Sequence, residues 1–177
     1  MKKSPQRPTG FTIVELLIVI VVIAILAAIV IAVYTGAQTK AYNAQRYQEL
    51  KEWQKQFLDY RSVNGSYPAM PVGGYCLGTG FPNGKCRDYQ TTGSTTYNES
   101  DNAVLMSMLK STTGSLPNGP HVGVNGTVGF YAIYYGGQDI DIDMVMYGGP
   151  SDYPADTIYN WHDGAGRLIC AMKLLNQ

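Results

Sequence analysis

The sequence predicts an α+β protein, in which one long N-terminal helix packs on an antiparallel β-sheet head. The first observation is a proline-free stretch over residues 11–61, apolar in its first half and polar with regularly spaced apolar positions in its second. The second is the remainder of the chain, where short apolar runs alternate with turn residues. Its many glycines and tyrosines, 20 and 14 in the whole chain, are typical of strands joined by tight turns.

The apolar stretch FTIVELLIVIVVIAILAAIVIAV occupies residues 11–33 and carries a single charge, on Glu15. A helix of this length spans roughly 34 Å, which is enough to cross the hydrocarbon core of a bilayer. Lys2, Lys3 and Arg7 precede it, and the positive-inside rule places such residues in the cytoplasm and the rest of the chain outside. We therefore predict a transmembrane helix over residues 11–34.

The position of Gly10 argues against an ordinary signal peptide. In a signal peptide the small residues of the cleavage site follow the apolar stretch, whereas Gly10 precedes it. Cleavage after Gly10 would remove a basic leader, residues 1–10, and keep the helix. From hydropathy alone, a plain uncleaved anchor is the alternative. Neither reading explains Glu15, because a carboxylate within a membrane helix is costly and is a functional candidate by default.

The segment KKSPQRPTGFTIVELL resembles the leader of a type IV prepilin or pseudopilin: a basic leader ends in Gly10, Phe11 follows, and Glu15 is the fifth residue after the cut. The resemblance implies a pilin-like fold, cleavage between Gly10 and Phe11 by a membrane aspartyl peptidase that also methylates Phe11, and polymerisation through the helix. Many relatives carry a proline within the apolar segment, and this sequence does not.

The resemblance also implies a role for Glu15 and a set of partners. In the family's filaments the glutamate faces the N-terminal ammonium of a neighbouring subunit, and two opposite charges compensate each other where the dielectric constant is low. Glu15 would then be the assembly residue of a homo-oligomeric helical filament. The implied partners are the prepilin peptidase/methyltransferase, the pilus assembly platform and its ATPases. The implied precursor lies in the inner membrane with its head outside, and the assembled pilus is extracellular.

Three roles within this family stay open. A structural subunit of a type IV pilus would serve adhesion, twitching motility or DNA uptake. A pseudopilin would act in a type II secretion-like system, and the GSYP sequence at residues 65–68 is similar to a motif often found in pseudopilins. A minor tip pilin would act as a binding module. The large head rich in glycine and tyrosine favours the pilus subunit.

Residues 35–63 predict an amphipathic helix that continues the transmembrane helix and forms the spine of the head. Its apolar side chains recur at spacings of three and four, so they form one stripe that faces the head. Asn64–Gly65 and Pro68 predict the end of this helix. The stripe consists of Tyr47, Leu50, Trp53, Phe57 and Tyr60.

Residues 64–177 predict the globular α+β head. A short helix over residues 98–110 would be capped by Ser100 or Asp101. Strand signals flank an Asn125–Gly126 turn within residues 121–135. Further strands are expected at residues 139–147 and 167–174, and residues 148–166 are expected to form a long surface loop.

The three cysteines allow three pairings, and the sequence does not decide among them. Cys76 and Cys86 lie in one glycine- and proline-rich loop outside the membrane, where oxidising conditions favour a disulfide. We favour this pair, which leaves Cys170 as a buried thiol in the apolar run RLICAMKLL. Cys170 as a disulfide partner stays open, because many type IV pilins tie a C-terminal loop with a disulfide.

Asp139, Asp141 and Asp143 alternate with apolar residues, so in a strand their side chains share one face. We expect that face to be exposed to solvent. The alternative is a calcium site completed by Asp152 or Asp156, although the spacing does not match an EF-hand loop.

Other chemistry finds no support in the sequence. HExxH, CxxC, GxSxG and phosphate-loop motifs are missing, so we expect neither enzymatic activity nor a cofactor. The formal net charge is zero, and residues 88–163 contain Lys110 as their one base among many acids. Since binding to nucleic acids depends on Lys and Arg at phosphates, direct nucleic-acid binding is not expected.

Overall fold

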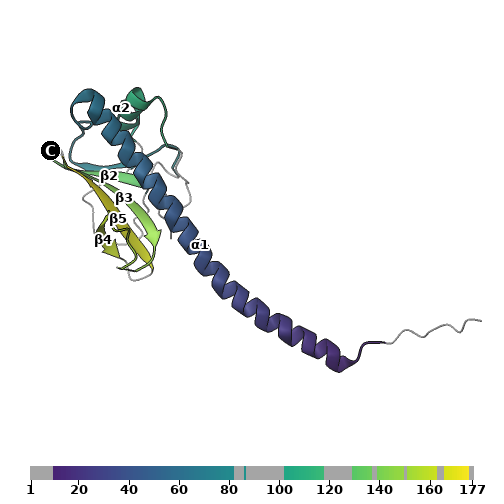
Figure 1. Ribbon diagram of the computed structural model, residues 1–177. Helices are drawn as coiled ribbons and strands as arrows, with labels where there is room; N and C mark the ends of the chain where they lie inside the picture. Colours follow the sequence, from purple (N-terminus) through teal and green to yellow (C-terminus); the bar gives the residue numbers. More distant parts are fainter. Residues whose placement is uncertain are drawn as a thin grey trace, which may run out of the picture. The chain divides into compact units, whose positions relative to one another are not determined.

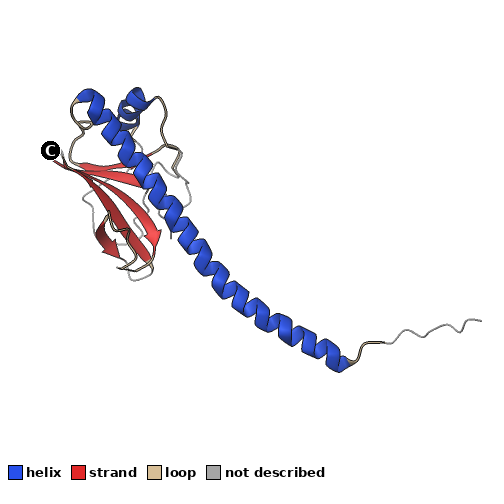
Figure 2. Ribbon diagram, viewed as in Figure 1, coloured by secondary structure: helices blue, strands red, loops and turns tan. Residues whose placement is uncertain are grey.

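The computed structural model confirms the α+β class, and its elements follow in the order α1, β1, α2, β2, β3, β4, β5 (Figures 1 and 2). The chain divides into two compact units, residues 1–40 and 41–177. The structure describes residues 10–81, 86, 102–117, 129–136, 139–149, 151–162 and 166–175.

Helix α1 extends over Ile13–Asn64, which confirms the expected long N-terminal helix. It ends where the sequence predicted. Gly65 adopts a left-handed conformation with φ of +79°, a conformation that costs glycine no steric penalty. The N–H of Gly65 donates to the carbonyl of Arg61 at 2.8 Å. The side-chain amide of Asn64 donates to the carbonyl of Tyr60 at 2.9 Å, so two carbonyls near the end of the helix have partners.

The head contains one antiparallel sheet with the strand order β1-β2-β3-β5-β4. The expected strands at residues 139–147 and 167–174 are confirmed as β3 and β5. The expected Asn125–Gly126 turn lies outside the described residues. The strands are β1 Gly73–Leu77, β2 Phe130–Gly136, β3 Asp139–Tyr147, β4 Ile158–His162 and β5 Arg167–Leu174.

Strand β4 corrects the expectation that all of residues 148–166 form a surface loop. Ile158 pairs with Ala171 and His162 with Leu168, so β4 is an edge strand on β5. A five-residue strand is too short to show a clear alternation of apolar and polar residues. The neighbouring strand β5 supplies the backbone partners that make this segment a strand.

Helix α2, Ala103–Thr113, begins later than the sequence analysis predicted. Its N-cap is Asn102, whose side-chain oxygen accepts from the N–H of Leu105 at 2.9 Å, so the predicted caps Ser100 and Asp101 are wrong. Asn, Asp and Ser are comparably good caps, and local sequence could not choose among three neighbours. The helix ends at Gly114, which has φ of +76°.

The core of the head lies between one face of the sheet and the two helices. Figure 1 shows the second half of α1 crossing this face, with α2 beside the C-terminal end of α1. The predicted stripe is confirmed, because Leu50, Trp53 and Phe57 are fully buried in this core and Tyr47 and Tyr60 pack at its margin. Burial of such side chains contributes about 1.5–3 kcal/mol each. The sheet contributes Phe130, Ala132, Tyr134, Ile140, Ile142, Met144, Met146, Leu168, Cys170, Met172 and Leu174, and α2 contributes Leu105, Met106 and Leu109.

A buried arginine on α1 also contacts the sheet. Arg46 is 1 % exposed, and its guanidinium lies 4.0 Å from the centroid of the Phe130 ring. Its Nη2 donates to the carbonyl of Gly129 at 2.8 Å. A charged donor to a buried carbonyl makes a stronger hydrogen bond than a neutral one, so Arg46 ties α1 to the start of β2.

Asn43 ties α1 to the end of β3. Its amide nitrogen donates to the carbonyl of Tyr147 at 2.7 Å, and its amide oxygen accepts from the N–H of the same residue at 3.0 Å. The side chain thus pairs with the strand backbone as another strand would. Arg46 and Asn43 together set the register of α1 along the sheet.

Candidate functional site

The first turn of α1 contains the residues that the sequence analysis singled out. Thr12 immediately precedes the helix, and its hydroxyl oxygen accepts from the N–H of Glu15 at 3.3 Å. In return, Oε2 of Glu15 accepts from the N–H and from the hydroxyl of Thr12, both at 2.8 Å. This reciprocal pattern is a capping box, which satisfies two backbone donors that a helix N-terminus otherwise leaves unpaired.

Glu15 therefore has a partner within its own chain. Its negative charge is also favourable in the first turn, where the helix dipole is positive. Sequence reasoning missed Thr12, although the spacing T-x-x-E is itself the signature of a capping box. Cleavage after Gly10 would leave both Thr12 and its N–H in place, so the box is compatible with processing. The assembly role of Glu15 stays a prediction.

Gly10 and Phe11 have no packing role in the described structure. A Cβ atom added at Gly10 would meet nothing within 4 Å, and Phe11 is 87 % exposed. The fold therefore does not require a glycine before Phe11. A requirement for glycine at this position would have to come from another molecule.

The first part of α1 presents apolar side chains on all sides. The described Ile, Val and Leu side chains of residues 13–31 are between 47 % and 86 % exposed. None of the most apolar 18-residue segment of α1 is buried, and by length and composition this helix could cross a membrane. A helix that is apolar all round needs an apolar environment, such as a bilayer or the packed core of an assembly.

The comparisons with known proteins find this same segment. Residues 6–31 match the model of the prokaryotic N-terminal methylation motif. The chain therefore carries a prepilin-type processing motif, and the motif together with the pilin-like architecture is consistent with the type IV pilin and pseudopilin family. A comparison with curated proteins found no match, and neither did a comparison with solved structures.

In the head, Cys76 and Cys86 form a disulfide, as predicted, with their Cα atoms 5.5 Å apart. Cys170 is a free and buried cysteine, also as predicted. Side chains alternate along β2, so Tyr131 and Ile133 point away from the core under α1. The disulfide and Phe81 pack on them, which makes a second apolar cluster on the outer face of the sheet.

This outer cluster changes the expected environment of the aspartates on β3. Asp143 lies opposite Tyr131 and Asp141 opposite Ile133 in the sheet register, so both share the outer face. They are 1 % and 5 % exposed, and the prediction of a solvent-exposed face is wrong for them. Asp139 alone of the three is exposed. Burial raises the pKa of the Asp141 carboxyl, although a hydrogen bond with Tyr135 opposes this rise.

The two residues proposed to complete a calcium site are engaged elsewhere. Asp152 accepts from the N–H of Gly149 at 2.6 Å, and Asp156 forms an ion pair with Lys51 at 3.0 Å. Among the described residues, no group of three or more His, Cys, Asp or Glu side chains is arranged to hold a metal ion. Calcium binding was the alternative interpretation of these aspartates, and it stays untested.

Proposed function

We propose that this chain is a structural subunit of an extracellular type IV pilus. The prepilin peptidase cuts between Gly10 and Phe11 and methylates Phe11, and the subunits polymerise through the apolar half of α1. The observation that carries the proposal is the methylation motif at residues 6–31, located where an all-round apolar helix begins. The precursor is then a single-pass protein of the cytoplasmic membrane with its head outside, and the platform and ATPases of the pilus machinery extract it.

Glu15 has two roles in this proposal. In its own chain it completes the capping box with Thr12. In the filament its carboxylate compensates the N-terminal ammonium of a neighbouring subunit's Phe11. Both charges are costly in an apolar surrounding unless they are paired, so a subunit leaves the bilayer only in the register that pairs them.

Substitution of Glu15 separates these two roles. Glu15→Gln keeps a side chain that can complete a capping box but removes the charge, whereas Glu15→Ala removes both. We expect both variants to be inserted and cleaved and to form no filaments, because the unpaired ammonium remains. Thr12→Val is the matched control, since it weakens the box and leaves the charge. Normal filaments from Glu15→Gln would refute the charge-pairing role and leave capping as the function of Glu15.

A pseudopilin of a type II secretion-like system is the second candidate, because the GSYP sequence directly follows α1. Mass spectrometry of filaments sheared from cells distinguishes the candidates. An abundant protein that begins at methylated Phe11 is expected for a pilus subunit. The same processed peptide confined to the membrane fraction would favour the pseudopilin or a minor subunit. An intact N-terminus at Met1 in the membrane would refute processing altogether.

A further inference from the structure

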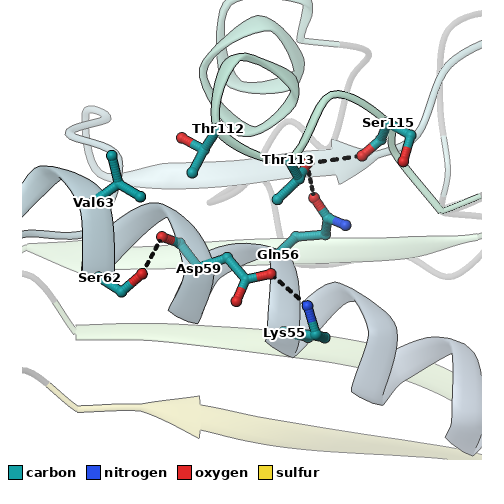
Figure 3. A pocket seen from close by; sticks show the side chains of 8 residues that line it. All are labelled: Lys55, Gln56, Asp59, Ser62, Val63, Thr112, Thr113 and Ser115. Atoms are coloured by element: carbon teal, nitrogen blue, oxygen red, sulfur yellow. Dashed lines mark hydrogen bonds and ion pairs between the residues drawn. The ribbon is translucent and has the colours of Figure 1, made fainter.

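A polar groove lies in the head between the last turns of α1 and the C-terminal end of α2 (Figure 3). Its volume is about 410 Å³, which is within the range of roughly 300–1,000 Å³ that is usual for ligand sites. The two helices contribute lining residues that are far apart in the sequence. The lining residues are Lys55, Gln56, Asp59, Ser62, Val63, Thr112, Thr113 and Ser115.

Hydrogen bonds between the two walls hold the groove in place. The hydroxyl of Thr113 on α2 donates to the amide oxygen of Gln56 on α1 at 2.5 Å, and the carbonyl of Ser115 is an alternative acceptor at 2.8 Å. The side-chain nitrogen of Asn64 also lies 3.5 Å from the hydroxyl of Thr112, a long contact that adds little. The groove is thus formed before any ligand arrives, which lowers the entropic cost of binding.

The chemistry of the walls selects one class of ligand. All the lining side chains except Val63 are polar, and they offer both donors and acceptors. The ammonium of Lys55 and the carboxylate of Asp59 form an ion pair at 2.6 Å, so the groove has no net charge. A polyanion would meet the carboxylate of Asp59, and a purely apolar ligand would leave the polar groups unpaired.

Neutral carbohydrates fit this set of groups. Each hydroxyl of a sugar ring donates one hydrogen bond and accepts others, so a pair of neighbouring hydroxyls can bind a carboxylate and an ammonium at once. The side chains of Lys55 and Asp59 are 73 % and 37 % exposed. The groove is therefore open to solvent, and a segment within a longer chain can enter it.

We propose that the groove between α1 and α2 binds a segment of a neutral carbohydrate chain, with Asp59 and Lys55 bonded to neighbouring hydroxyls. Gln56 on the α1 wall and Ser115 on the α2 wall supply further donors and acceptors (Figure 3). This site lies in the head, so the proposal holds for a pilus subunit and for a pseudopilin alike.

The test uses the full chain, purified in a detergent without a sugar head group. Saturation-transfer NMR and titration measure binding of neutral gluco-, manno- and galacto-oligosaccharides. Dextran sulfate, a polyanion, and a serine-rich peptide are tested in the same way as ligands of other classes. We expect a neutral oligosaccharide to bind in the millimolar range or tighter. Asp59→Asn should raise its Kd by about tenfold, the loss of roughly one charge-assisted hydrogen bond. The matched control is Glu52→Gln, an exposed carboxylate of α1 outside the groove, which should leave Kd unchanged.

Three results would overturn the proposal. The first is that no neutral oligosaccharide binds at millimolar concentration. The second is that only the sulfated polymer or only the peptide binds. The third is equal affinity of the wild-type chain and the Asp59→Asn variant, with Thr113→Val also unchanged, because binding would then occur elsewhere. Circular dichroism spectra of the variants establish that a loss of binding is not a loss of fold.

Discussion

Replacement of Arg46 by alanine should destabilise the head by about 3–5 kcal/mol, the usual cost of removing one partner from a buried charged network. The short bond from Arg46 Nη2 to the carbonyl of Gly129, at 2.8 Å, accounts for about 1.5–3 kcal/mol as a bond with a charged donor. The contact with the Phe130 ring, at 4.0 Å, adds about 0.5–2 kcal/mol. The bond from Nε to the carbonyl of Val145, at 3.4 Å, adds little because it is long.

The ion pair with Glu49 is the smaller part of the effect. The two charged groups are 3.6 Å apart, which is longer than a good hydrogen bond. Burial raises the pKa of Glu49, and hydrogen bonding to Gln45 and the charge of Arg46 both oppose this rise. Without Arg46 the Glu49 carboxylate is less well compensated at neutral pH. Protonation of Glu49 removes that charge. The loss of unfolding free energy in Arg46→Ala should therefore become smaller as the pH falls through the pKa of Glu49.

Urea unfolding of the head, residues 41–177, measures this loss, with circular dichroism as the signal. Arg46→Met keeps the apolar stem on Phe130 and should lose less than Arg46→Ala. The control is Lys55→Ala, because Lys55 forms an exposed ion pair of a kind that contributes about 0–1 kcal/mol. An Arg46→Ala head as stable as the Lys55→Ala head would refute the reasoning.

Two further predictions concern the outer face of the sheet. Reduction of the Cys76–Cys86 disulfide, or Cys76→Ser, should destabilise the head by about 2–3 kcal/mol for so short a loop; thermal melts with and without reductant measure this, and an unchanged Tm would contradict it. The raised pKa of buried Asp141 means that its carboxylate opposes folding above that pKa and ceases to do so as the pH falls below the unfolded value. Asp141→Asn should therefore be more stable than the wild-type head at pH 7, with the difference vanishing in acid; urea midpoints across pH test this, and a difference independent of pH would be incompatible with it.

The sequence by itself determined the features that depend on neighbours along the chain. The absence of proline and the repeat of Leu50, Trp53 and Phe57 predict α1 and the side of it that is buried, because a helix brings residues three and four apart onto one face. The same holds for the processing motif around Gly10 and for the strand at residues 139–147. The capping box of Thr12 and Glu15 was equally local, and it could have been read from their spacing.

Only the tertiary structure decided which faces of the helices and strands are buried, and which distant segments pack against them. Alternation along β3 correctly placed Asp141 and Asp143 on one face, yet it could not show that the disulfide cluster lies on that face or that both aspartates are buried there. The burial of Arg46 between α1 and the sheet depends on residues about 80 positions away, and the pairing of β4 with β5 depends on residues about 10 positions away. Periodicity along a chain predicts which residues point the same way, whereas burial depends on which distant segment packs against them, and that contact leaves no local signal.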